Sequence, residues 1–300
     1  MGALSGKTIF MSGGSRGIGE AIAVAAAKQG ANVAFAAKTD QPHPKLPGTI
    51  HTAVEAVEAA GGRGFGQICD IRDEDAVKAA VDKAAEHFGG IDIVVNNASA
   101  IQLTPTAATA VKRYDLMTGI NSRGTFVVTQ ACLPYLLESD HARILTLSPP
   151  LDFNPVWFKN HSAYSLAKYG MSILTMGWAA EFKGKIAANC LWPRTAIDTA
   201  AVRNLLGGKA VASMSRTPEI MGDAAAAMLA KDVDFTGLAC LDDLVLAAEG
   251  VTDFDQYSVT PGSKLQLDFF FPHDAPEPAD ADGMVGWRAQ ALPGRAEGRA

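Results

Sequence analysis

Short apolar runs alternate with longer helix-forming segments along most of this chain. The runs predict β-strands at residues 7–11, 32–37, 63–69, 91–95, 143–147, 185–191 and 238–241. The intervening segments predict helices at about residues 20–28, 49–60, 73–88, 112–137, 164–182 and 218–230. Strands joined through helices run parallel in one sheet with helices on both faces. The pattern therefore predicts a single α/β domain with a doubly wound parallel sheet of the Rossmann type.

Two regions break this alternation. Residues 194–217 are irregular, with Gly207 and Gly208 as a candidate hinge, and we interpret this segment as a lid over the substrate. After Pro272 the composition turns to Ala, Pro, Gly and charged residues, which is typical of disorder. We therefore expect one domain over residues 1–271 and a disordered tail over residues 272–300.

Composition excludes several classes of partner. The net charge is −6, and there is no basic run to neutralise phosphates, which argues against nucleic-acid binding. No apolar stretch approaches the ~18 residues of a membrane helix, and the N-terminus lacks a signal-peptide pattern. The cysteines are scattered without a Cys-x-x-Cys pair, which favours reduced thiols over a metal site or disulfides. We therefore expect a cytoplasmic protein with no metal, no nucleic-acid partner and no membrane span.

A glycine-rich turn follows the first predicted strand and precedes the first predicted helix. It reads Ser12-Gly-Gly-Ser-Arg-Gly-Ile-Gly19. Its glycines let the backbone and the helix N-terminus approach a pyrophosphate, whose charge the helix dipole favours. An ordinary tight turn would carry the same glycines. The strand before and the helix after favour a dinucleotide site.

Tyr164 and Lys168 are four residues apart in a predicted helix, so their side chains lie on one face about one turn apart. A phenol ordinarily titrates near pH ~10, which makes it a poor proton-transfer group at neutral pH. A neighbouring ammonium lowers that pKa toward the working range. The pair is therefore typical of a proton relay, although isolated Tyr–Lys pairs also occur by chance on solvated helices.

Further polar residues follow the predicted strands, at the edge where ligands bind in such sheets. Asp70 ends the third strand, and Asn96 and Asn97 follow the fourth. Ser148 ends the fifth strand, and Asn121 lies in the long predicted helix. A cap or a turn explains each residue alone. Their shared edge favours one common site.

In this order and spacing, the motifs resemble the short-chain dehydrogenase/reductase family over roughly residues 5–245. The matching motifs are the glycine turn, Asn96-Asn-Ala98, Asn121, Tyr164-x-x-x-Lys168 and Pro193. The hydroxysteroid dehydrogenase-like group within this family is more similar still, through residues 36–49, 154–158, 192–197 and 261–271. Some proteins of that group carry a C-terminal sterol-carrier domain, which we do not expect in this chain.

The resemblance implies a role for each matched residue. Tyr164 would pass a proton to or from the substrate oxygen, and Lys168 would lower the pKa of Tyr164 and bind the nicotinamide ribose. Asn121 would hold a water behind Lys168, Asp70 would meet the adenine, and Asn97 would pack beside the ribose. The implied cofactor-binding residues are Gly13, Ser15, Arg16, Gly17, Ile18, Gly19, Lys38, Asp70, Ile71, Asn97, Ala98, Tyr164, Lys168, Pro193, Thr195 and Ile197.

The end of the second strand indicates which cofactor is used. Family members that prefer NAD usually have an acidic residue there, which binds the ribose hydroxyls. This chain has Ala37-Lys38 at that position and Arg16 in the glycine turn. Two cations facing the 2′-position suit a phosphate, so we expect NADP(H) rather than NAD(H). A solvated loop lysine is the alternative interpretation of Lys38.

Two positions depart from the family pattern. The family serine stands thirteen residues before the tyrosine, where this chain has Leu151. We expect Ser148, sixteen residues before, to hydrogen-bond the substrate carbonyl; the alternative is that it only ends its strand. Arg194 stands where the family usually has glycine. It is either a surface arginine or directed toward an acidic substrate group.

The loop at residues 149–158 is rich in apolar and aromatic side chains, which would wall the substrate side of the cleft. Such a lining indicates a hydrophobic or acyl-type substrate, although packing beneath a lid explains the same residues as well. The resemblance further implies a homodimer or homotetramer paired through the long helix and the tyrosine helix.

We therefore expect an enzyme that interconverts a carbonyl and an alcohol on a small hydrophobic or acyl-type molecule with NADP(H). The expected catalytic residues are Tyr164, Lys168, Asn121 and Ser148. One alternative is an enoyl-type reductase that uses the same cofactor on a carbon–carbon double bond. The other is a dinucleotide-binding sensor or scaffold without catalytic activity.

Overall fold

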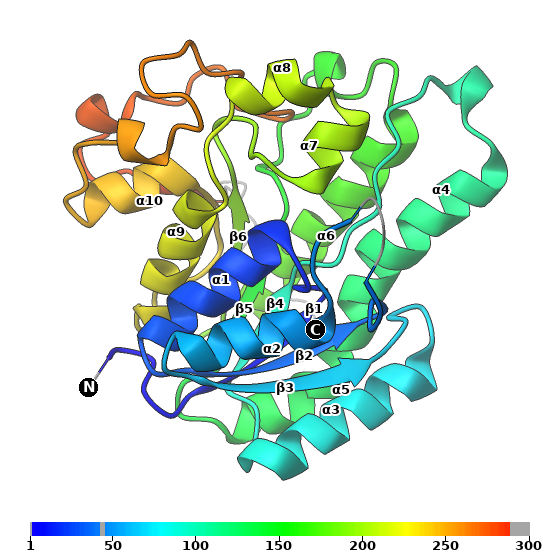
Figure 1. Cartoon of the computed structure of the whole chain (residues 1–300), viewed down its shortest axis with the longest axis vertical. Coiled ribbons are helices and arrows are strands. Elements are labelled where there is room, and N and C mark those ends of the chain that lie inside the picture. The colour runs from blue at the N-terminus through cyan, green and yellow to red at the C-terminus, as the bar shows by residue number, and fades with distance from the viewer. Residues whose placement is uncertain (1, 43–45, 289–300) are drawn as a thin grey trace, which may run out of the picture.

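One eight-stranded sheet organises the molecule, a computed structural model in which residues 2–42 and 46–288 are described (Figure 1). The spatial strand order is β3-β2-β1-β4-β5-β6-β7-β8. Neighbouring strands are parallel except β7 and β8, which are antiparallel. The strands are β1 Thr8–Ser12, β2 Asn32–Ala37, β3 Arg63–Ile68, β4 Ile93–Asn96, β5 Arg143–Thr146, β6 Ala187–Trp192, β7 Leu238–Leu241 and β8 Gly286–Arg288. The predicted α/β doubly wound single domain is confirmed.

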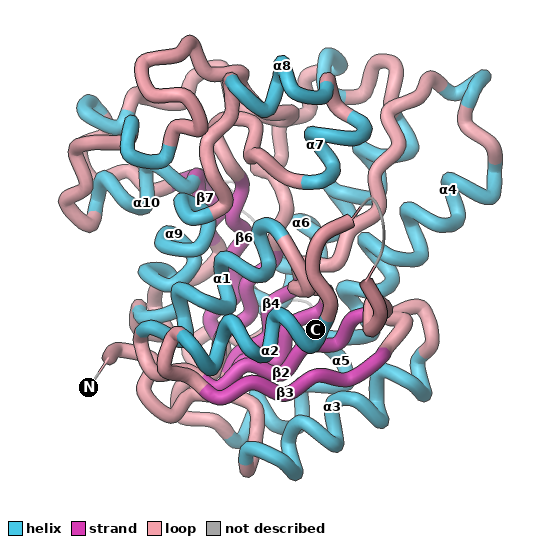
Figure 2. The backbone as a smooth tube through the Cα atoms, in the orientation of Figure 1, coloured by secondary structure: helices cyan, strands magenta, loops and turns pink. Residues whose placement is uncertain are grey.

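Helices cover both faces of this sheet (Figure 2). One apolar core lies between the strands and α1, α2 and α9, and a second lies between the strands and α3, α5 and α6. The helices are α1 Gly17–Lys28, α2 Ile50–Ala59, α3 Glu74–Phe88, α4 Val111–Thr118, α5 Gly124–Glu138, α6 Ser162–Glu181, α7 Ala200–Leu205, α8 Gly208–Ser213, α9 Glu219–Ala230 and α10 Asp242–Ala248.

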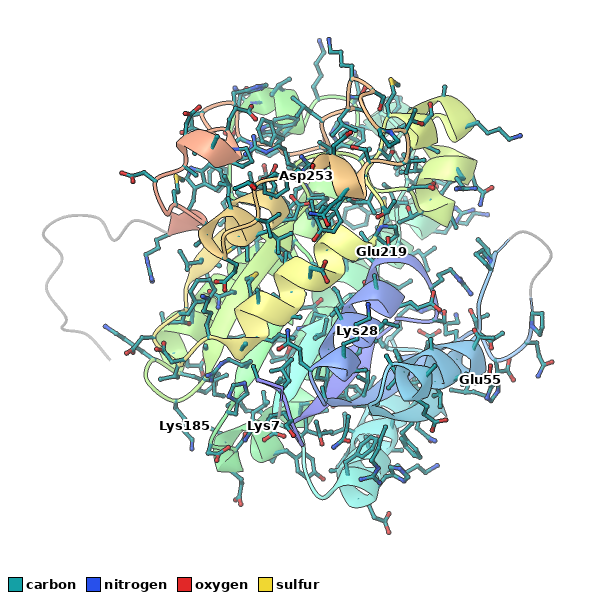
Figure 3. The ribbon with its side chains drawn as sticks, turned by 60° about the vertical axis from the view of Figure 1, so that its left-hand side comes forward. Lys7, Lys28, Glu55, Lys185, Glu219 and Asp253 are labelled. Atoms are coloured by element: carbon teal, nitrogen blue, oxygen red, sulfur yellow. The ribbon has the colours of Figure 1, made fainter. Side chains whose placement is uncertain are left out.

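Alternation along β1 shows how the sequence builds both cores. Ile9 and Met11 belong to the first core, and Phe10 between them belongs to the second. Successive side chains of a strand point to opposite faces, so a strand covered on both sides must be apolar throughout. Burying each such side chain contributes about 1.5–3 kcal/mol. Outside the cores, Lys28, Glu55 and Glu219 are exposed on the helices (Figure 3).

The predicted long helix over residues 112–137 differs from the observed one at its centre. A π-helical turn at Gly119–Arg123 joins α4 to α5, and it contains Asn121. Such a turn accommodates one extra residue and is frequent at functional sites. The extra residue redirects the Asn121 side chain, which ordinary helical spacing does not predict.

The predicted lid contains regular structure. Two short helices, α7 and α8, follow each other within residues 194–217 at the top of the view in Figure 1. Gly207 precedes α8 and Gly208 begins it, with φ of 112° and 66°, a conformation that favours glycine. The glycine pair therefore marks the joint between two helices inside the segment that we interpreted as a lid.

Residues 272–288 differ from the predicted disordered tail. They lie against the body of the protein, and β8 pairs with β7 through Leu238↔Arg288 and Cys240↔Gly286. A side chain at Gly286 would place its Cβ 2.2 Å from the Ala239 carbonyl oxygen, so glycine is required for this close approach. A strand of three residues carries no alternation that sequence analysis could recognise. Residues 289–300 of the predicted tail lie outside the described residues.

All four cysteines, Cys69, Cys132, Cys190 and Cys240, are free and buried. Burial raises the pKa of Cys69 and of Cys190 to about 11, so these thiols stay protonated at neutral pH. In the part of the chain that the structure describes, no three His, Cys, Asp or Glu side chains converge to hold a metal. Over the same residues, none of the helices combines the length and the apolar character needed to cross a membrane.

Candidate active site

The strand order reverses between β1 and β4, and in sheets of this kind ligands bind outside the carboxyl ends of the strands at this point. Ser12 at the end of β1 ties the two ends together. Its Oγ accepts hydrogen bonds from the backbone N–H groups of Asn97 and Ala98, each at 3.2 Å. The Asn97 Nδ2 donates to the Ser12 carbonyl at 3.2 Å. These bonds hold the predicted ribose neighbours Asn97 and Ala98 beside the glycine turn.

The glycine turn packs so closely on its surroundings that side chains larger than a hydrogen atom are disfavoured at its glycines. Gly17 has φ of 58°, in the left-handed region. A Cβ on Gly19 would lie 2.5 Å from the Asn97 Nδ2 and 2.7 Å from the Gly14 Cα. Arg16 makes no side-chain cap at the N-terminus of α1, so the first amides of this helix are available to an anion. This cradle fits a pyrophosphate.

The other predicted residues of the turn lie close by. Ser15 is buried, and Ile18 packs on the first apolar core. The Arg16 guanidinium donates to the carbonyls of Pro47 and Gly48 at 2.7 and 3.0 Å. Arg16 therefore connects the glycine turn to the loop that follows β2.

Lys38, Asp70 and Arg72 form a row of charges at the ends of β2 and β3. The Lys38 Nζ lies 3.1 Å from the Asp70 carboxylate, and the Arg72 guanidinium lies 2.5 Å from it. The Arg72 hydrogen bonds lower the pKa of Asp70 well below its usual range, so Asp70 is ionised at neutral pH. Ile71 beside it is buried. Ala37 ends β2 without a carboxylate.

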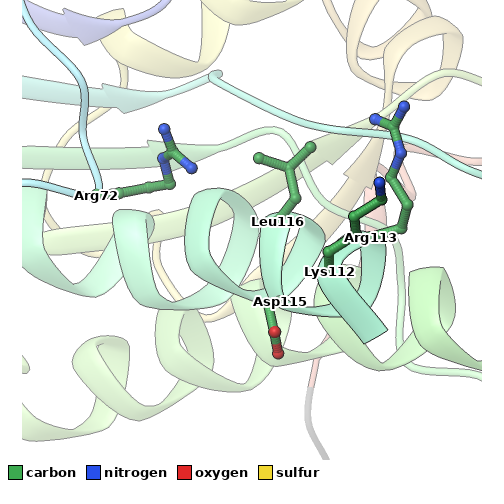
Figure 4. A pocket seen from close by; sticks show the side chains of 5 residues that line it. All are labelled: Arg72, Lys112, Arg113, Asp115 and Leu116. Carbon is green, nitrogen blue, oxygen red and sulfur yellow. The ribbon is translucent and has the colours of Figure 1, made fainter. Parts of the chain in front are cut away.

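A basic cleft of about 430 Å³ lies beyond this row, lined by Arg72, Lys112, Arg113, Asp115 and Leu116. Figure 4 shows Arg72 and Arg113 on either side of Leu116, with Asp115 turned to the opposite side of α4. The ends of β2 and β3 and the start of α4 therefore present more cations than anions.

Tyr164 and Lys168 lie one turn apart on α6, as their spacing predicts, and both are buried. The Lys168 Nζ donates to the Leu147 carbonyl at 2.5 Å and lies 4.9 Å from the centre of the Trp192 ring. Burial lowers the pKa of Lys168 to about 7. Burial, followed by the Asp268 carboxylate, raises the pKa of Tyr164 above its ordinary value.

The shift of Tyr164 is opposite to the direction that the Tyr–Lys spacing predicts. A lysine with a pKa of about 7 is only partly charged at neutral pH, and its Nζ is directed to a backbone carbonyl. It therefore adds little positive potential at the phenol to offset desolvation. The geometry keeps Tyr164 protonated, which suits a group that donates a proton.

Asn121 is fully buried in the π-helical turn. Its Oδ1 accepts a hydrogen bond from the Ala100 N–H at 2.8 Å, and its Nδ2 donates to the Ala100 carbonyl at 3.1 Å. These two bonds anchor the chain that leaves β4. The role of Asn121 behind Lys168 stays a prediction.

Ser148 is fully buried, and its Oγ has no hydrogen-bond partner within residues 2–42 and 46–288. The hydroxyl lies beside the Cys190 thiol of β6 without the geometry of a hydrogen bond. The neighbouring Pro149 carbonyl accepts from the Ser172 hydroxyl at 2.6 Å. Ser148 is therefore set into the protein interior. Its contact with a substrate carbonyl stays a prediction.

Arg194 follows neither of the alternatives that the sequence left open. It is buried, and its guanidinium pairs with Asp243 of α10 and donates to the Pro276 carbonyl at 2.6 Å. The same guanidinium lies 5.0 Å from the centre of the Phe271 ring. Arg194 therefore binds the C-terminal part of the chain and not the solvent or a substrate.

The other residues after β6 are also enclosed. Thr195 forms an isolated bridge with Leu267, and its buried Oγ1 lacks a partner among the described residues. Ile197 bridges to Arg216, and Pro193 is buried. An unpartnered buried hydroxyl at Thr195 fits the predicted cofactor contact, because such a group ordinarily finds a hydrogen bond.

Three residues near the site were not predicted. Thr199 caps α7, and its methyl group would lie 3.4 Å from a Cβ on Gly17, so it faces the glycine turn. Phe270 stacks on Tyr164, with ring centres 6.0 Å apart. Desolvation raises the pKa of Asp268 to about 7, and its charge acts on both Tyr164 and Lys168. A threonine before a helix-forming run is a recognisable cap signal; Asp268 and Phe270 offered no local signal.

The loop at residues 149–158 packs partly under the protein surface, as predicted. Leu151, Trp157 and Phe158 lie against the apolar cluster that contains Tyr164, whereas Phe153 is 69% exposed. Beside this loop, α6 and residues 272–274 border a cavity of about 640 Å³. Packing therefore describes the buried part of this loop, and the substrate lining stays a prediction.

Comparison with known proteins agrees with this arrangement. The sequence profile named short chain dehydrogenase matches residues 7–209. Hydroxysteroid dehydrogenase-like protein 2 from Xenopus tropicalis is 53% identical over 298 residues, which span 99% of this chain and 71% of that protein. Two solved structures are also similar over most of the chain.

The first is a candidate dehydrogenase from Xanthomonas campestris, 54% identical with a TM-score of 0.87, covering 90% of this chain and 99% of that one. The second is a short chain dehydrogenase from Mycobacterium thermoresistibile, 51% identical with a TM-score of 0.86. That similarity covers 91% of this chain and 98% of the other.

Proposed function

The chain belongs to the short-chain dehydrogenase family of oxidoreductases, which bind nicotinamide dinucleotides, and on this premise we propose that it interconverts a carbonyl and an alcohol with NADP(H). The proposed substrate is a small hydrophobic or acyl-type molecule, with Tyr164 as the general acid and base. The observation that carries the proposal is the convergence of Tyr164 and Lys168 on one face of α6, beside the strand ends that border the glycine cradle.

The side chains support a reaction in which Tyr164 gives its proton to the oxygen of a reduced carbonyl. The raised pKa of Tyr164 keeps its Oη protonated at neutral pH, ready to donate. When bound, the nicotinamide would supply or accept the hydride. Lys168, with a pKa of about 7, can return a proton toward the phenol, and Asn121 holds the backbone around Ala100 in register. Ser148 is the proposed hydroxyl donor to the substrate carbonyl.

The decisive experiment is NADPH oxidation by the purified protein across aldehydes, ketones and acyl-chain carbonyls. Tyr164→Phe is the paired variant and should lose about 10²–10⁴-fold in kcat while keeping the Kd for NADPH. Undiminished turnover in this variant would contradict the proposed role of Tyr164. NADPH binding without turnover on any carbonyl would favour the sensor interpretation, and reduction of a carbon–carbon double bond would favour the enoyl-type reductase.

Ser148→Ala tests the displaced serine separately. If the hydroxyl polarises the substrate, kcat should fall by about 10²-fold with cofactor binding kept, as when one oxyanion donor is removed. An unchanged kcat would assign Ser148 to the strand end alone. The burial of Ser148 beside Cys190 favours an unchanged kcat, and a large loss in kcat would show that the hydroxyl nevertheless reaches the substrate.

We propose NADP(H) as the cofactor because β2 ends at Ala37 without a carboxylate and the next residue is the cation Lys38. Lys38 is 60% exposed on its side chain and can leave Asp70 for a phosphate, and Arg16 lies at the start of α1. Titrations with NADPH and NADH under the same salt conditions test this. Equal affinities would reject it.

We further propose a cytosolic homo-oligomer. The buried, reduced cysteines support the compartment. Large apolar side chains on α5 and α6 support self-association, because Phe126 and Leu137 are 42% exposed and Leu166 and Ile173 are 56% and 55% exposed. Light scattering at several protein concentrations would measure the assembly, and a monomer at all of them would reject it.

A further inference from the structure

A segment at residues 266–271, called the strap here, crosses the substrate side of the candidate site. Its backbone is tied to the chain that follows β6: Ala196 N–H donates to the Gln266 carbonyl at 2.8 Å, and Asp268 N–H donates to the Arg194 carbonyl at 3.0 Å. The Trp192 Nε1 donates to the Phe269 carbonyl at 2.6 Å. The strap lies beyond residues 7–209, the part that matches the family profile.

Phe270 is the residue that the strap inserts. Its side chain is fully buried, and its ring lies within 6.1 Å, centre to centre, of the rings of Tyr164, Tyr169, Trp192 and Trp157. The Phe270 and Tyr164 rings are nearly parallel, at 29°. Phe270 also has φ of 62°, a left-handed conformation that is costly for a bulky residue. The strap hydrogen bonds and the aromatic packing hold it there.

Phe270 therefore covers the proposed proton donor. Tyr164 is only 5% exposed, and the Phe270 ring lies over one face of its phenol ring. The neighbouring aromatic residues of the strap face elsewhere: Phe269 packs on His161, with ring centres 5.5 Å apart, and Phe271 lies under the Arg194 guanidinium. Within the strap, only Phe270 stacks its ring on that of Tyr164.

We propose that Phe270 is a specificity-determining residue: its ring forms the roof over Tyr164 and restricts the site to carbonyls on unbranched or flat carbon skeletons. This inference rests on the proposed function of the same site. It makes the C-terminal segment part of the substrate site, and it predicts that enlarging the space above Tyr164 admits bulkier ketones.

Two substitutions separate the effect of the Phe270 ring from the effect of its strained backbone. Phe270→Gly removes the ring and also relieves the positive φ, whereas Phe270→Leu keeps an apolar side chain and the strained backbone. Phe254→Leu is the matched control, because Phe254 lies under Arg216 and not against Tyr164. Thermal unfolding identifies which variants are folded, and Phe270→Leu carries the test if Phe270→Gly fails to fold.

The measurement is the ratio of kcat/KM for a bicyclic ketone, 1-decalone, to that for hexanal, with NADPH. We expect this ratio to rise about 10-fold in Phe270→Gly and less in Phe270→Leu, the range that changes in pocket volume produce. The Phe254→Leu ratio should equal that of the unchanged protein. A constant ratio in folded, active Phe270 variants would overturn the proposal.

A second experiment measures ligand binding and does not depend on turnover. Calorimetry with 1-decalol, the alcohol that corresponds to 1-decalone, and the NADPH-bound protein should give about 10-fold tighter binding in Phe270→Gly, by the same gain in space. Tighter binding without turnover on any carbonyl would reject the proposed oxidoreductase and keep the roof. Unchanged binding in folded Phe270→Gly would reject the roof whether or not the enzyme is active.

Discussion

The glycine cradle and the strap both belong to the candidate site, but they are built differently. In the cradle, the decisive contacts join the ends of two neighbouring strands, Ser12 of β1 and Asn97 after β4, and a helix that starts five residues after β1. Around the strap, Trp192 donates to the Phe269 carbonyl and Arg194 binds Asp243 and Pro276, across 77, 49 and 82 residues of chain. The proposed nucleotide side of the site is built on the ends of the sheet strands. The proposed substrate side is assembled from loops held by long-range bonds.

This difference teaches which changes each side should tolerate. Side chains in the cradle are missing where a backbone must approach, so any addition there clashes. The strap depends on a buried ion cluster and on aromatic packing, so removal of a partner should loosen it. The following predictions run from the largest expected effect to the smallest.

Arg194→Met should have the largest effect, a loss of about 3 kcal/mol in the free energy of unfolding. The variant leaves the Asp243 carboxylate buried with one cation, Arg216, at 3.1 Å, and removing one partner of a buried pair is costly. Urea unfolding measures the loss. Arg203→Met is the control, because its pair with Asp198 is 61% exposed on the arginine side and should contribute less than about 1 kcal/mol. Similar losses in both variants would contradict the buried anchor.

Gly19→Ala should weaken NADPH binding by about 100-fold, because the new Cβ meets the Asn97 amide and the Gly14 Cα. Fluorescence titration of the bound cofactor measures the change. Gly177→Ala on α6 is the control, since its Cβ meets nothing within 4 Å. An affinity in Gly19→Ala within threefold of the unchanged protein would show that the cradle adapts.

Asp268→Asn should stabilise the strap at high pH. The carboxyl of the unfolded chain loses its proton near pH ~4, whereas that of the folded protein, with a pKa of about 7, keeps its proton to a higher pH. Stability therefore falls as the pH rises from about 4 to about 7. Asparagine is neutral throughout, so the variant should raise the Tm at pH 8 by about 3 °C and change it little at pH 4.

The same substitution has a second readout, at the phenol. The charged and titratable neighbours of Asp268 are Lys168, Tyr164 and Asp242. Removing the Asp268 charge should lower the pKa of Tyr164 and move the pH profile of alcohol oxidation toward acid. Asp253→Asn, an exposed carboxylate labelled in Figure 3, should alter neither measurement. A Tm difference that is the same at both pH values would contradict the assignment.

Lys38→Ala should have the smallest effect, about a fivefold loss in NADPH affinity with NADH affinity unchanged. The Lys38 side chain is 60% exposed and shares Asp70 with Arg72, so solvent and the carboxylate both weaken its contribution. Titrations at two salt concentrations measure the difference, with Lys28→Ala on the outside of α1 as the control. Equal losses of affinity for NADPH and NADH would show that Lys38 does not bind the 2′-phosphate.

The sequence predicts the cradle better than the strap for a physical reason. The glycine turn, Tyr164 and Lys168 depend on spacings of a few residues, which helix and strand geometry determine. The π-helical turn at Asn121 and the three-residue β8 are too short to leave a periodic pattern. The positions of Arg194 and Phe270 depend on partners that no local pattern identifies.

Ser148 shows, in one residue, the same limit of prediction from local sequence patterns. Its place at the end of β5 follows from the apolar run before it. The direction of its hydroxyl, beside Cys190 and away from a hydrogen-bond partner, depends on how β6 packs against β5. Sequence analysis could locate this side chain on the correct edge but not choose between its two roles.

The buried cysteines make it possible to measure how readily different parts of the protein open. Cys69 follows β3 and lies in one apolar core, and Cys240 lies in β7 and belongs to the other. A thiol reagent can modify each one only while its surroundings are transiently open, so the modification rate reports the local opening free energy. Pulsed alkylation read by mass spectrometry would therefore give separate opening free energies for the two cores in the unmodified sequence, without any introduced probe.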